Sequence, residues 1–156
     1  MGNLIFRLLP NGTAVVSQAP FGKKLKFSEG QKAHQERFSE AAFYARQAAK
    51  DHPIYAELAA EAPMKTAYNF ALSDWFNPPM IHRIERGEGS ILVEASDNVM
   101  VTKVQVKILN EEGKILEKGE GIRREGDWWE FASHAEGKTI MAEAWDLPGH
   151  VTRLVL

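Results

Sequence analysis

The stretch Lys103-Val-Gln-Val-Lys-Ile108 decides the fold of the C-terminal half of this chain. Val104, Val106 and Ile108 alternate with polar residues, so a strand here has one apolar face and one wet face. The same period of two recurs in residues 139–145. A strand that is apolar on one face only is typical of an antiparallel sheet packed on one side.

Turn residues divide the rest of this half into short segments of similar length. The pattern predicts strands over residues 81–86, 90–96, 101–109, 114–118, 127–132, 139–145 and 150–155. Short strands at regular spacing, separated by glycine and proline turns, are typical of a two-sheet sandwich. We therefore expect residues 80–156 to form one all-β module.

Two segments of this half resemble the bacterial immunoglobulin-like domains. They are Glu94-Ala-Ser-Asp97-Asn98-Val-Met-Val-Thr-Lys-Val104-Gln-Val106 and Ala142-Glu-Ala144-Trp-Asp146-Leu-Pro-Gly149-His150, which match that family's Ala-x-Asp-Asn, Val-x-x-Val-x-Val and Ala-x-Ala-x-Asp-x-x-Gly-Asn motifs. His150 stands where the family usually has asparagine. The resemblance implies an immunoglobulin-like β-sandwich, a fold that serves as spacer, adhesive repeat, filament subunit or carbohydrate-binding partner. The whole chain also resembles small uncharacterised bacterial proteins that join helices to such a module, and no catalytic residue carries over from them.

The N-terminus predicts a β-hairpin. Two β-prone runs, 3–9 and 13–18, flank Pro10-Asn11-Gly12, a sequence suited to a tight turn. Two isolated strands are only marginally stable in water, so the hairpin must lie on its own helices or on a neighbouring subunit. Its apolar residues form a predicted strand-exchange segment, comprising Leu4, Ile5, Phe6, Val15 and Val16.

Helices are predicted between the hairpin and the β module. Ser28 can cap a helix that runs to about Lys50, and its alanine-rich stripe favours an antiparallel hairpin with the next helix. That second helix runs from about Pro53 to Ala62, and Pro63 forces a kink or restart before the pattern continues to Phe76. Asn77-Pro78-Pro79 ends it. We expect an α+β protein with a hairpin-plus-helix region over 1–79 and the sandwich over 80–156.

The residue inventory does not favour an enzyme. Without cysteine there is no disulfide, thiolate metal site or cysteine nucleophile. The five histidines are scattered, no Gly-x-Ser-x-Gly elbow occurs, and Gly137-Lys138-Thr139 lacks the glycine that a phosphate-binding loop needs. We predict no catalytic residue and no cofactor. Asp97 and Asp146 sit at strand ends, where a carboxylate either binds calcium or accepts hydrogen bonds from turn amides.

No segment predicts membrane insertion. The apolar N-terminal stretch is too short for a signal-peptide core and lacks a small-residue cleavage site, so we expect no cleaved leader. No apolar run is long enough to span a bilayer. Missing cysteines fit an intracellular protein and equally a secreted bacterial one, and this leaves the compartment open, including a surface-assembly role.

Charge is distributed unevenly along the chain. Residues 1–50 carry eight Lys/Arg against three Asp/Glu, a balance of +5, whereas residues 80–156 carry ten against fourteen, a balance of −4. This asymmetry is first of all explained by a solvated surface, and it could favour head-to-tail association as readily as nucleic-acid binding. Lys23, Lys24 and Lys26 form a basic loop that could bind an anionic polymer, but a pI near 6.2 favours a solvated loop, and we do not expect nucleic acid as a partner.

Trp128, Met141 and Trp145 are the predicted interaction surface. Strict alternation places them away from the core, beside Glu130 and Glu143. Exposed aromatic residues rimmed by carboxylates suit burial against the chain's own helices, a protein partner or a carbohydrate.

Two hypotheses of function follow. The first is a non-enzymatic structural protein that self-associates through β-strand edges, as a filament or surface-structure subunit, with the N-terminal hairpin pairing with a sandwich edge of another copy. The alternative is a monomeric immunoglobulin-like module that binds a carbohydrate or a partner protein through its tryptophan face.

Overall fold

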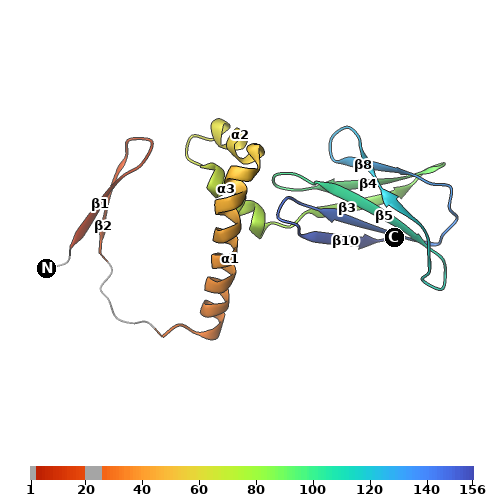
Figure 1. Cartoon of the computed structure of the whole chain (residues 1–156), viewed down its shortest axis with the longest axis horizontal. Coiled ribbons are helices and arrows are strands. Elements are labelled where there is room, and N and C mark those ends of the chain that lie inside the picture. The colour runs from red at the N-terminus through yellow and green to blue at the C-terminus, as the bar shows by residue number, and fades with distance from the viewer. Residues whose placement is uncertain (1–2, 20–25) are drawn as a thin grey trace. The chain divides into compact units, whose positions relative to one another are not determined.

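The computed structural model describes residues 3–19 and 26–156. The chain divides into two compact units, Met1–Leu72 and Ser73–Leu156, and each is described by itself. The division falls inside helix α3 (Ala67–Phe76), on the N-terminal side of the Pro78-Pro79 pair. The α+β class expected from the sequence is confirmed, because helices and antiparallel sheets are both present (Figure 1).

The first unit begins with the predicted hairpin. Strands β1 (Leu4–Leu8) and β2 (Ala14–Gln18) pair antiparallel. Gly12 takes a φ of 83°, a left-handed conformation that glycine adopts without steric cost. The Asn11 side chain accepts a hydrogen bond from the Thr13 amide at 3.0 Å, which closes the turn. The Pro-Asn-Gly signal therefore predicted the turn correctly.

Two helices of the first unit also follow the sequence. Helix α1 (Glu29–Asp51) starts at Ser28, whose hydroxyl caps the Gln31 amide while the Gln31 side chain bonds back to the Ser28 amide. Helix α2 (Pro53–Glu61) begins at a proline, which has no amide hydrogen to leave unsatisfied. The hydroxyls of Tyr44 and Tyr55 lie 2.8 Å apart and join the two helices. The buried side chains of α1 are the small ones, namely Ala41, Ala42, Ala45 and Ala48.

Pro63 produces a restart, one of the two outcomes expected for it. Helix α2 ends at Glu61, and α3 begins only at Ala67. The hydroxyl of Thr66 accepts a hydrogen bond from the Asn69 amide at 3.3 Å and so starts the new helix.

The second unit contains two four-stranded antiparallel sheets (Figure 1). One has the order β3-β4-β8-β7 and the other the order β10-β9-β5-β6. The strands are β3 (Met80–Arg86), β4 (Ser90–Ser96), β5 (Lys103–Leu109), β6 (Ile115–Glu120), β7 (Ile122–Arg123), β8 (Trp128–Ala132), β9 (Thr139–Trp145) and β10 (Val151–Val155). All seven predicted strands are present within a few residues of their expected bounds. The sequence pattern missed the two-residue strand β7.

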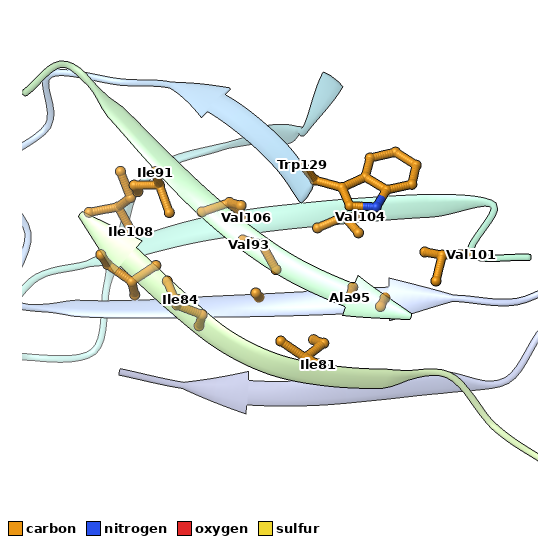
Figure 2. Packing of buried hydrophobic residues seen from close by; sticks show 13 residues of the cluster. Ile81, Ile84, Ile91, Val93, Ala95, Val101, Val104, Val106, Ile108 and Trp129 are labelled. Atoms are coloured by element: carbon orange, nitrogen blue, oxygen red, sulfur yellow. The ribbon is translucent and has the colours of Figure 1, made fainter. Parts of the chain in front are cut away.

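One hydrophobic core lies between the two sheets (Figure 2). Val104, Val106 and Ile108 are fully buried in it, as their alternation predicted. They face side chains from the other sheet, including Ile91, Val93 and Trp129, which are labelled in the same view. The outward residues of β5 are only partly buried, so the sheet has one packed face and one wetter face.

Strand β3 departs from simple alternation. The pairing of β3 with β4 shifts between Ile81 and Arg83, so His82 is an extra residue in the strand. Because of this bulge, Ile81 and Ile84 both point into the core although three positions separate them. The His82 ring bonds to the Ser96 hydroxyl at 2.6 Å.

Candidate interaction surfaces

The hairpin carries an exposed apolar face. Its register places Leu4, Phe6 and Leu8 on the same side as Val16 of the partner strand. Leu4, Phe6 and Leu8 are 59%, 71% and 76% exposed, and Val16 is exposed as well. Ile5 and Val15, which the sequence grouped with them, lie on the opposite face. The predicted strand-exchange segment is therefore split between two faces, of which one is almost wholly apolar.

The outer edge of β1 offers a row of backbone groups. The Leu9 amide bonds to the Thr13 carbonyl at 2.9 Å and the Ala19 amide to the Asn3 carbonyl at 2.7 Å, so the odd-numbered residues of β1 form the hydrogen-bonded pairs. The amides and carbonyls of Leu4, Phe6 and Leu8 consequently point away from β2. These three residues therefore carry both large apolar side chains and backbone groups that can pair with another strand.

The edges of the two four-stranded sheets differ in how well they are protected against pairing. Strand β3 is bulged and charged, and β7 has only two residues. The pairing of β6 is shifted near Ile115, and the strand carries three charged residues. Bulges, charges and shortness all oppose pairing with another chain. Among these four edge strands, β10 is the least protected, since its register is regular over five residues and Arg153 is its single charge.

The free edge of β10 is defined by alternation. Leu156 and Ile140 exchange both backbone hydrogen bonds, at 2.8 and 2.9 Å, and the register of β10 with β9 is unbroken. Thr152 and Leu154 therefore bond toward β9, whereas the amides and carbonyls of Val151, Arg153 and Val155 point away from it. Strand β3 of the other sheet approaches β10 but does not pair with it. The sequence pattern does not identify this edge, although Val151 and Val155 mark its outer side.

Met141 and Trp145 lie on the outer face of the sheet that β10 borders. The register sets Val151 beside Trp145 and Val155 beside Met141. Val151 and Val155 are 48% and 52% exposed, so the apolar surface begun by Trp145 and Met141 continues to the edge. The ammonium group of Lys103 lies 4.2 Å from the centre of the Trp145 ring.

A buried carboxylate lies between these apolar positions. Glu143 is 4% exposed and receives hydrogen bonds from Lys107 Nζ at 2.6 Å and from Arg153 Nε at 2.9 Å. Burial by itself raises the pKa of the Glu143 carboxyl, but the hydrogen bonds and charges of the two cations outweigh it and hold that pKa below its ordinary value. Glu143 therefore fixes the Arg153 side chain on the outer face of the edge strand.

Trp128 is not part of this surface. It lies on β8, in the other sheet, where it points away from the core that its neighbour Trp129 enters. The guanidinium of Arg83 lies 4.7 Å from the centre of its ring. The expected single patch is thus divided, because alternation defines which way a side chain points but not which sheet its strand joins. Met141 and Trp145 are together, and Trp128 is on the outer face of the opposite sheet.

The other residues singled out by the sequence are those of the basic loop and two aspartates at strand ends. Lys26 is exposed, and Lys23 and Lys24 of the basic loop lie outside the described residues. Asp97 accepts hydrogen bonds from the amides of Val99 and Met100, at 2.8 and 2.9 Å. Asp146 accepts from the amide of His150 at 2.6 Å and bonds to its ring nitrogen Nδ1 at 2.8 Å. Both carboxylates thus accept hydrogen bonds within their own turns. The described residues contain no cluster of three or more metal-ligating side chains.

A cavity of about 330 Å³ lies where the β3–β4 and β8–β9 connections meet. Arg86, which lines it, donates a hydrogen bond to the Gly137 carbonyl at 2.7 Å. The hydroxyl of Ser133 donates to Glu117 at 2.6 Å, so its proton is not directed at the neighbouring His134. The cavity therefore does not present a paired nucleophile and base among the side chains that the structure describes.

Comparison with known proteins finds no protein-family model, no curated protein and no solved structure that matches this chain. Among the described residues, no helix has the length and apolar character required to cross a membrane.

Proposed function

We propose that the chain is a non-enzymatic assembly subunit that self-associates through β-strand edges, the hairpin of one copy docking on the sandwich of another. The observation that carries the proposal is the exposure of Leu4, Phe6 and Leu8 on one face of a two-stranded sheet. Water-exposed apolar residues concentrated on one small element mark a surface that another surface covers.

The stability of the hairpin supports this proposal. A two-stranded sheet is marginal in water unless further strands or a packing surface complete it. Pairing with a sheet edge of another copy supplies both, because it satisfies the outer backbone groups of a strand and covers its apolar side chains. The opposite charges of residues 1–50 and 80–156 add attraction between copies.

We also propose that the second unit is an immunoglobulin-like sandwich. In that fold one sheet has the strand order A-B-E-D and the other G-F-C, and the orders β3-β4-β8-β7 and β10-β9-β5 correspond to them, with β6 as an additional strand beside β5. The Asp146–Gly149 turn supports the assignment, since Gly149 takes a φ of 90° where the family motif has glycine. Such sandwiches have open edges that another strand can join.

The alternative hypothesis, a binding module that uses its tryptophans, has weaker support. Trp128 and Trp145 are on different sheets, so they do not form one platform. A cation, Arg83 or Lys103, already contacts each ring. A sugar stacking on either ring would have to displace that cation.

The test is the mass distribution of the purified full chain at micromolar concentration, measured by light scattering and negative-stain microscopy. Wild type should form oligomers or filaments, and the double variant Leu4→Lys/Leu8→Lys should be monomeric. Ser17→Lys places one lysine on the opposite face of the hairpin and serves as the control that still assembles. A monomeric wild type contradicts the proposal, and so does equal assembly by the Leu4→Lys/Leu8→Lys variant.

A further inference from the structure

We infer that the docking site for the hairpin is the free edge of β10 in a second copy of this chain, and that β1 is the strand that joins it. The inference rests on the proposed function and specifies both partners of the contact. It extends the sheet β10-β9-β5-β6 by the two strands of the hairpin.

The choice of β10 follows from comparison of the four edge strands in the second unit. A joining strand needs a straight row of backbone donors and acceptors, and Val151, Arg153 and Val155 provide one. Lys118 and Glu120 on β6 also direct their backbone groups outward, because Gly121 bonds to Val104 in the same register. That edge, however, is charged and its pairing is shifted near Ile115. The β10 edge is flanked by exposed valines instead.

The choice of β1 follows from what its outer edge carries. Leu4, Phe6 and Leu8 present their backbone groups to a partner, and all three side chains are large and apolar. The corresponding outward residues of β2 are Ala14, Val16 and Gln18, which are smaller or polar. Strands β1 and β10 have the same length of five residues, so three outward residues on one match three on the other.

An antiparallel arrangement brings these three residues together in pairs. It places Leu8 beside Val151, Phe6 beside Arg153 and Leu4 beside Val155, with each pair on one face of the extended sheet. Two of these pairs are apolar. In the third, the Phe6 ring meets a guanidinium that Glu143 already holds in position, a geometry suited to cation–π contact.

The side chains of the joined strand continue an existing surface. Val151 adjoins Trp145 and Val155 adjoins Met141 on the outer face, so Leu8 and Leu4 lengthen two apolar rows. Net charge favours the contact, because the donor strand belongs to the part of the chain with a balance of +5 and the acceptor to the part with a balance of −4.

The contact is heterologous, because the donor and acceptor surfaces of one copy are different. Each copy can then give one strand and receive another, and repetition produces a ring or an open filament. Blocking one surface leaves the other available, which allows the two surfaces to be tested separately in full-length protein.

At a residue whose amide points away from the sheet, a proline substitution removes that hydrogen-bond donor. It does not break a hydrogen bond to the neighbouring strand of the same sheet. The edge-blocked variant is Val151→Pro/Val155→Pro, and its matched control is Lys118→Pro/Glu120→Pro on the opposite edge of the same sheet. The donor-blocked variant is Phe6→Pro, and its control is Val16→Pro on the outer edge of β2. Circular dichroism checks that each variant is folded. If the edge-blocked variant does not fold, Val151→Lys/Val155→Lys replaces it, because lysine on an edge opposes pairing while retaining the amide.

The expected result has two parts. Each blocked variant alone stays monomeric in light scattering whereas both controls assemble as wild type does. An equimolar mixture of the two blocked variants forms a one-to-one complex, because one supplies an intact β1 and the other an intact β10.

The contrary results separate this inference from the proposed function. Assembly by the folded edge-blocked variant overturns β10 as the acceptor but leaves self-association standing. Assembly by Phe6→Pro with loss of assembly in Val16→Pro overturns β1 as the donor. Absence of a mixed complex overturns the pairing of these two strands. A monomeric wild type overturns the proposed function and this inference together.

Discussion

Arg153 on the edge strand β10 donates a hydrogen bond from Nε to Oε1 of Glu143 on the adjacent strand β9, at 2.9 Å. The acceptor is 4% exposed, and Lys107 binds its other oxygen. One buried carboxylate thus orders the side chains of two cations on the outer face of the sheet. Its state of ionisation should affect the stability of the second unit.

The first prediction concerns pH. Because the folded-state pKa of Glu143 lies below its ordinary value of 4.5, ionised Glu143 stabilises the folded unit at pH values above that ordinary pKa. The contribution should be lost as the pH falls below 4.5 through the lower folded-state pKa. Thermal unfolding of wild type and Glu143→Gln, followed from neutral to acidic pH, measures it. At neutral pH the variant should be less stable by about 1–3 kcal/mol.

The comparison with the variant isolates this carboxylate from the other acidic residues. Glu143→Gln should show a smaller loss of stability on acidification than wild type, so the two curves should converge at low pH. Glu111→Gln is the matched control, because Glu111 pairs with Lys138 on the surface, where both side chains are mostly exposed. Parallel curves for wild type and Glu143→Gln would contradict the prediction.

The strands of the second unit could be predicted because their local pattern and their burial agree. Val104, Val106 and Ile108 alternate in sequence and are all buried. Ile81 and Ile84 do not alternate, and only the bulge at His82 explains why both are buried. A bulge depends on pairing with β4, which a single strand's sequence does not specify.

The candidate site was predicted less well for a related reason. The sequence indicated that Trp128 and Trp145 both point away from the core, and they do. It did not specify that β8 and β9 join different sheets, so a single patch was expected where two faces exist. The sequence also did not predict the free edge of β10, because an edge is defined by the absence of a neighbouring strand and not by a residue type. The apolar hairpin, in contrast, was evident from its own residues.

A second prediction concerns the start of α1. Ser28→Ala removes the hydroxyl that caps the Gln31 amide and should destabilise the helix by about 1 kcal/mol. Ser28→Asp keeps a capping oxygen and should preserve stability. Helical circular dichroism during thermal unfolding compares the two variants. Equal loss in both would show that the cap does not limit the stability of this helix.

A third prediction concerns close packing at Gly137. A Cβ atom at this position would lie 2.3 Å from Cγ2 of Ile108 and 2.7 Å from the carbonyl oxygen of Leu109, so the backbone would have to move. Gly137→Ala should therefore destabilise the second unit by about 1–3 kcal/mol in denaturant unfolding. Gly87→Ala is the matched control, since its Cβ would meet the Ser90 hydroxyl at an ordinary 3.5 Å. Similar unfolding midpoints for the two variants would contradict this account.

The last prediction concerns salt and the proposed assembly. Residues 1–50 carry a balance of +5 and residues 80–156 a balance of −4, so attraction between copies should weaken as salt shortens the screening length from about 10 Å at 0.1 M to about 3 Å at 1 M. Light scattering over this range should show a falling average mass. The variant Lys26→Glu alters an exposed residue outside both proposed strands and lowers the net charge of residues 1–50 by two. It should assemble less than wild type at low salt and equally at high salt, where screening removes the difference. Assembly that stays constant or increases with salt would mean that apolar and backbone contacts alone join the copies.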